Sequence, residues 1–200
     1  MKNVYTHISK ILADEKIIEN KDIAICKYGL EMFVLSVIEI MFILILSILT
    51  KNFFNTLLFL TFFISLRIYA GGYHAETKTR CFLVFLATHA LFTITINHLP
   101  IEHYLKISTL SMILSIVIVL MKSPIINTNK IVCDNEINAY RKISIFIVVL
   151  QSLVIVIGLL LFPLSKLILS LTLGQLTVAI SMIAAIMKNK LQGGASNEKD

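Results

Sequence analysis

A short polar segment in an otherwise apolar chain carries a candidate catalytic pair, His74 and Cys81. An ionised thiol attacks carbonyl carbon, and a histidine can take up and return a proton near neutral pH. Cys81 follows Lys78 and Arg80 at the expected start of a helix, and a helix N-terminus and nearby cations both lower a thiol's pKa. The segment therefore predicts cysteine-based acyl chemistry. On spacing alone, an interfacial histidine and a small apolar cysteine are the alternative.

The distance between His74 and Cys81 requires a bend in the chain. Seven residues along a straight helix span about 10 Å, which is too far for a direct hydrogen bond. Gly71 and Gly72 precede the histidine, and glycine adopts backbone angles that other residues avoid. We therefore expect His74 on an irregular turn that folds back over the start of the following helix, at the membrane surface.

The elements that must position this segment are membrane-spanning helices. The 200 residues are 57% hydrophobic and only 15% charged, whereas soluble domains carry about 25% charged residues. This composition excludes a soluble protein and predicts an all-α integral membrane protein. A helix needs roughly 20 apolar residues to cross a bilayer. Six apolar runs are long enough to cross the bilayer: 29–50, 53–70, 81–97, 104–121, 143–164 and 167–187. Together they predict a single membrane-embedded domain over 1–200.

The distribution of Lys and Arg predicts how these spans are oriented. Alternate segments between the six spans hold 15 of the 18 basic residues, which is the pattern of the positive-inside rule. Both termini, the loop around 67–80 and the loop around 122–142 are therefore expected at the cytoplasmic face of the cell membrane. Residues 1–20 have the pattern of an amphipathic helix that lies on the membrane surface, although a helix packed on the protein's own loops is as plausible. Residues 188–200 have the composition of a flexible tail.

The cysteine count and spacing argue against disulfides and metal sites. Cys26, Cys81 and Cys133 all fall on the reducing side of the predicted topology, where structural disulfides are rare. Neither a metal-ligand spacing nor a phosphate-binding glycine loop occurs. We therefore expect no cofactor. The excess of basic residues is explained by topology and lipid contact rather than by nucleic acid.

Around this polar segment the chain resembles the accessory gene regulator protein B family (AgrB), membrane cysteine endopeptidases of Gram-positive quorum sensing. The matching residues are Arg67, the core Gly71-Gly72-Tyr73-His74-Ala75, and Cys81. The segment Tyr28-Gly29-Leu30-Glu31, the length and the number of spans also fit. The resemblance covers essentially the whole chain.

The resemblance implies that Cys81 is the nucleophile, that His74 is the general base and acid, and that Arg67 and Gly72 match positions needed for activity. The implied substrate is an AgrD-like propeptide with an acidic C-terminal segment, which Lys78 and Arg80 would attract. Cleavage through a thioester, followed by cyclisation to a thiolactone or lactone, and a homodimer are implied as well. The alternative function is a small-peptide exporter without peptidase activity.

Two acidic residues and one histidine lie inside predicted spans, where ionisable groups are costly. Glu31 is expected near the depth of Arg67 and could pair with it or orient His74; a purely stabilising pair is equally consistent with its position. Glu39 is expected in a structural or dimer contact. His89 follows Cys81 by about two helical turns, and the sequence does not assign it a role.

Overall fold

The computed structural model describes residues 2–73, 77–125 and 134–196, and within these ranges the regular elements are helices. Seven are α-helices: α1 (Lys2–Asp14), α2 (Ile23–Leu49), α3 (Phe53–Ala70), α4 (Lys78–His98), α5 (Tyr104–Lys122), α6 (Asp134–Leu161) and α7 (Lys166–Ser196). Two single turns of 3₁₀-helix, at Asn20–Asp22 and Ile101–His103, lead into α2 and α5. Six helices, α2 to α7, are long and apolar enough to cross a membrane. The predicted helical class and the number of spans are confirmed.

The helix boundaries differ from the predicted ranges in several places. The first helix ends at Asp14 rather than near residue 20, and Lys16 has a positive φ of 56°. Helix α6 begins at 134, nine residues before the predicted span, because its first turns are polar but still helical. It ends at Leu161, two residues before Pro163, which restricts the residue that precedes it. Helix α7 continues to Ser196, so most of the predicted tail is helix.

The chain divides into two compact units, which are described separately. The first covers 1–46 and holds α1 and most of α2. The second covers 47–200 and holds the end of α2 and helices α3 to α7. The residues expected to do chemistry, apart from Glu31, belong to the second unit.

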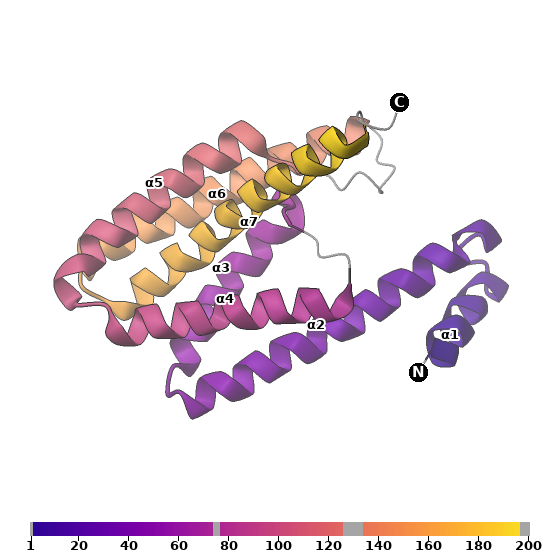
Figure 1. The fold of residues 1–200 in the computed structure, drawn as a ribbon, viewed down its shortest axis with the longest axis horizontal. Helices are drawn as coiled ribbons and strands as arrows, with labels where there is room; N and C mark the ends of the chain where they lie inside the picture. Colours follow the sequence, from indigo (N-terminus) through magenta and orange to yellow (C-terminus); the bar gives the residue numbers. More distant parts are fainter. Residues whose placement is uncertain (1, 74–76, 126–133, 197–200) are drawn as a thin grey trace. The chain divides into compact units, whose positions relative to one another are not determined.

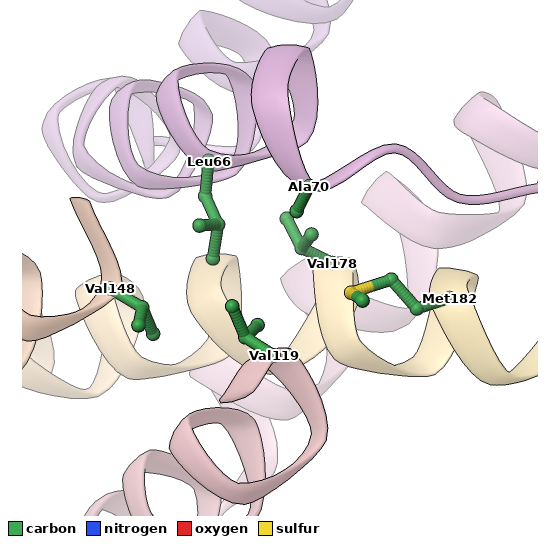
Figure 2. Packing of buried hydrophobic residues seen from close by; sticks show 6 residues of the cluster. All are labelled: Leu66, Ala70, Val119, Val148, Val178 and Met182. Carbon is green, nitrogen blue, oxygen red and sulfur yellow. The ribbon is translucent and has the colours of Figure 1, made fainter. Parts of the chain in front are cut away.

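Helix α7 is the central element of the second unit, because it packs along both α3 and α5 and also contacts α4 and α6 (Figure 1). Figure 2 shows where four of these helices meet. The six labelled side chains are fully buried: Leu66 and Ala70 of α3, Val119 of α5, Val148 of α6, and Val178 and Met182 of α7. The core thus reaches the last turn of α3, beside which the polar segment begins.

Large apolar side chains also cover the outward faces of the second unit. Phe54, Phe146 and Leu160, for example, are 73%, 67% and 79% exposed. An apolar surface of this extent is unfavourable in water but is solvated well by lipid chains. The fold therefore has the surface of a multi-pass membrane protein.

Buried amides join the helices inside this apolar surface. The Nε2 of Gln151 on α6 donates to the carbonyl oxygen of Phe62 (3.0 Å) and to the hydroxyl of Ser65 (2.9 Å) on α3. The Nε2 of Gln175 on α7 donates to the hydroxyl of Ser152 on α6 (3.0 Å). Interhelical hydrogen bonds of this kind help to hold helices together where lipid removes the hydrophobic driving force.

Candidate active site

Arg67, in the last turn of α3, links three parts of the second unit. Its Nη1 donates to the hydroxyl oxygen of Ser181 on α7 (3.3 Å), and its Nη2 donates to the backbone carbonyl of Tyr73. The planar guanidinium presents donors in a fixed fork, so one side chain can hold two acceptors at once. Arg67 therefore joins the end of α3 and the segment after it to α7.

Helix α3 ends at Ala70 because the chain turns sharply at Gly71. Gly71 has a φ of 75°, and its N–H still donates to the Arg67 carbonyl (3.1 Å). The backbone then runs beside Ile125, whose N–H donates to the Ala70 carbonyl (2.9 Å) and which forms a single parallel bridge with Gly71. A Cβ atom at position 71 would overlap the Ile125 carbonyl oxygen, so only glycine fits.

Gly72 is restricted by the side chains that the turn must accommodate. It has a φ of 136°, and a Cβ atom there would overlap Nη1 of Arg67 and lie 2.5 Å from Oγ of Ser181. The space beside this glycine is therefore occupied by the hydrogen bond between Arg67 and Ser181. The expected bend at Gly71 and Gly72 is present, and the absence of a side chain at Gly72 also leaves space for the Arg67 guanidinium.

Helix α7 holds Tyr73 at two points. The backbone N–H of Tyr73 donates to the carbonyl oxygen of Ser181 (2.9 Å), and Nζ of Lys188 lies over the tyrosine ring at 5.4 Å from its centroid. Together with the bond from Arg67, these contacts fix the backbone of the residue that precedes His74 in the sequence.

Cys81 lies in the first turn of α4, which begins at Lys78, three residues before the predicted span that starts at Cys81. The Thr77 hydroxyl caps this helix by accepting from the N–H of Arg80 (3.3 Å), and the N–H of Cys81 donates to the Thr77 carbonyl (3.1 Å). The thiol is half-buried, whereas Lys78 and Arg80 are exposed. An ionised Cys81 sulfur also interacts electrostatically with the Arg67 guanidinium.

The remaining candidate residues lie outside the described residues, in the first unit, or further along α4. His74 and Cys133 lie outside the described residues. Glu31 and Glu39 belong to α2 in the first unit, so the pairing of Glu31 with Arg67 stays a prediction. His89 is buried in α4, where its Nε2 lies 3.5 Å from the Thr93 hydroxyl. Among the residues of the three described ranges, no group of three His, Cys, Asp or Glu side chains could hold a metal ion.

Sequence reasoning missed Ser181 and Lys188. Ser181 is one of several small polar residues in the last span, and nothing in the local pattern distinguishes it from Ser170 or Thr177. Lys188 reads as one of the basic residues at a cytoplasmic helix end. Both become informative only when α7 is packed against the end of α3.

This arrangement suits nucleophilic chemistry on a carbonyl group. A thiol stands at a capped helix N-terminus, where the helix dipole favours a negative charge. A half-buried cation at the end of α3, held by two hydrogen bonds, interacts electrostatically with the ionised thiol. The same cation bonds the backbone carbonyl of Tyr73, the residue that precedes His74 in the sequence.

Comparison with known proteins identifies a family for nearly the whole chain. The family described as accessory gene regulator B (AgrB), whose members are involved in autoinducer peptide processing in quorum sensing, matches residues 5–187. No curated protein and no solved structure gives a significant match. The matched range includes five of the six membrane-length helices completely, most of the sixth, the glycine turn and Cys81. The chain therefore belongs to the accessory gene regulator B family.

Proposed function

We propose that this protein is a membrane cysteine endopeptidase that removes the C-terminal segment of an AgrD-like autoinducer propeptide. Cys81 is the nucleophile, and His74 is the general base and acid. The observation that carries the proposal is the convergence on Arg67, whose guanidinium bonds the Tyr73 backbone and interacts with an ionised Cys81. Membership of a peptide-processing family supplies the substrate class.

In the first half of the reaction His74 takes the thiol proton, and the Cys81 sulfur attacks the scissile carbonyl carbon. The carbon–nitrogen bond then breaks as His74 returns the proton to the departing amine. The products are the free C-terminal segment and a thioester between Cys81 and the remaining propeptide. The capped N-terminus of α4 and the Arg67 charge favour the thiolate that starts this sequence.

In the second half a Cys or Ser side chain of the propeptide attacks the thioester carbonyl. Its proton passes to His74 and then to the departing Cys81 sulfur, and a thiolactone or lactone ring results. Exchange of one thioester for another conserves the acyl activation, so ring closure to a thiolactone needs no ATP. Water must be kept from the thioester, and the half-buried position of Cys81 in an apolar bundle favours this.

Charge supports the location of the reaction and the binding of the substrate. Lys78 and Arg80 are exposed in the first turn of α4, one turn or less from Cys81, and would attract an acidic propeptide segment. The excess of basic residues on this side of the sequence-derived topology supports a site at the cytoplasmic face. Association of α1 with the membrane surface and formation of a homodimer are further parts of the proposal.

The test is co-expression of the chain with an AgrD-like propeptide, followed by mass spectrometry of membranes and medium. Wild-type protein should release the C-terminal segment and yield a ring that has lost one water relative to the linear product. Cys81→Ala and His74→Ala should abolish both at unchanged membrane levels, whereas the matched control Cys26→Ala should retain them. Cleavage by Cys81→Ala would overturn the proposal. Peptide uptake into vesicles without cleavage would favour the exporter.

A further inference from the structure

We propose that Ser181 on α7 is a positioning residue for this reaction, because its hydroxyl fixes the Arg67 guanidinium that holds the Tyr73 backbone. The inference rests on the proposed endopeptidase function, in which Cys81 is the nucleophile. It assigns a role to a residue of the last span that lies far along the chain from the motif segment.

The hydroxyl group of Ser181 is oriented as an acceptor. It donates its proton to the carbonyl oxygen of Val178 in its own helix (2.8 Å). Because that single proton is already used, the hydroxyl oxygen presents lone pairs to Nη1 of Arg67 at 3.3 Å. Charged donors form stronger hydrogen bonds than neutral ones, so this contact restrains the guanidinium more than an ordinary serine contact would.

The part of α7 that carries Ser181 is held firmly by the core. Val178 and Met182, on either side of Ser181 along the helix, are fully buried with Ala70 at the end of α3 (Figure 2). A residue between two such anchors offers a fixed reference point. Its backbone carbonyl also accepts from the N–H of Tyr73 (2.9 Å), so one residue of α7 positions both Arg67 and the glycine turn.

The glycine turn is shaped around this hydrogen bond. A Cβ atom at Gly72 would meet the Arg67 guanidinium and the Ser181 hydroxyl together. The absence of a side chain at 72 is therefore needed for these two groups to approach each other. This crowding indicates that the pair, rather than Arg67 alone, occupies the space beside Gly72.

Loss of the Ser181 hydroxyl should affect Cys81 through Arg67. The guanidinium would lose one of its two acceptors and would rotate about the remaining bond to Tyr73. An ionised Cys81 would then be stabilised less well, and reaction at the sulfur would slow. We expect about a tenfold decrease in kcat, the size of a lost hydrogen bond to a charged group, with KM nearly unchanged because no substrate contact is removed.

The experiment compares Ser181→Ala and Ser181→Thr in the full chain reconstituted in liposomes. Thr177→Ala is the matched control, because the Thr177 hydroxyl is one turn away on α7 and donates to the Leu173 carbonyl of its own helix (2.8 Å). All variants carry Ser in place of Cys26 and Cys133, so that iodoacetamide reports on Cys81 alone. The rate of alkylation at neutral pH and the kinetics of propeptide cleavage are measured separately.

Ser181→Ala should slow alkylation of Cys81 and lower kcat, while Ser181→Thr, which keeps a hydroxyl, and Thr177→Ala should behave as wild type. Equal alkylation rates for wild type and Ser181→Ala would overturn the inference, even if Ser181→Ala lowers the amount of folded protein. Wild-type protein that is alkylated rapidly but cleaves nothing would instead refute the proposed function. The two failures are thus distinguishable.

Discussion

The guanidinium of Arg67 occupies the space that a side chain at Gly72 would fill. The arginine and the glycine are five residues apart in sequence, yet the end of α3 and the turn after it bring them into contact. The glycine is therefore needed for two reasons, its positive φ and the volume of the arginine. This relationship leads directly to the first prediction.

Gly72→Ala should abolish or severely reduce activity. The new Cβ atom must displace Arg67 or Ser181, and alanine at a φ of 136° costs about 1–3 kcal/mol of backbone strain. We expect propeptide cleavage to fall more than tenfold, measured by mass spectrometry at matched membrane levels. Gly29→Ala is the control, because a Cβ atom at that helical glycine meets no atom within 4 Å. Similar activity for both variants would contradict the packing described at Gly72.

Arg67→Lys should be almost as damaging as Arg67→Ala. A lysine keeps the positive charge, but its ammonium group lacks the fork that bonds Ser181 and the Tyr73 carbonyl together. Cleavage should fall at least tenfold in both variants, which corresponds to about 1.4 kcal/mol of transition-state stabilisation. The control is Arg141→Lys, at an exposed arginine of α6. Near-normal cleavage by Arg67→Lys would show that charge alone is sufficient.

Much of this fold follows from local sequence. Six apolar runs separated by charged segments predict six spans, and the third run predicts that Cys81 lies at a helix N-terminus, where the Thr77 hydroxyl caps α4. The pair Gly71-Gly72 predicts a turn, because neighbouring glycines next to an apolar helix relieve backbone restrictions. Each of these features depends on residues close together in the chain.

The contacts that complete the site depend instead on packing over long sequence distances. Ser181 and Lys188 reach Tyr73 only because α7 packs along α3, and the polar residues of α7 recur too often to single one out. The close fit at Gly72 likewise depends on where the Arg67 side chain turns. A periodic apolar pattern shows that a helix is buried, but it does not show which residue of another helix each side chain meets.

Phe59→Ala should destabilise the helical bundle without changing the chemistry. Phe59 of α3 is 1% exposed, and its ring lies 4.4 Å from that of Phe92 on α4 and 6.0 Å from that of Phe63. Removing it leaves a cavity and should cost about 3–5 kcal/mol. Thermal unfolding in detergent should show a lower Tm, while alkylation of Cys81 at low temperature stays at the wild-type rate.

The matched control for this core substitution is Phe54→Ala, one turn earlier on α3, where the ring is 73% exposed. Its removal leaves no internal cavity, so the Tm should change by a much smaller amount. A large decrease for both variants would mean that the outward face of α3 also makes stabilising contacts. A slower Cys81 reaction in Phe59→Ala alone would mean that the packing of α3 against α4 also positions the thiol.

The orientation of the spans provides the last prediction. Because 15 of the 18 Lys and Arg residues fall in alternate segments, both termini and the segment before Cys81 should face the cytoplasm. A fluorescent protein that folds only in the cytoplasm should be bright when fused after residue 190 and dark when fused after Lys51. An impermeant thiol reagent should label Cys81 in inverted vesicles but not in intact cells. Labelling in intact cells would place the thiol on the outer face, and the propeptide would then have to cross the membrane before cleavage.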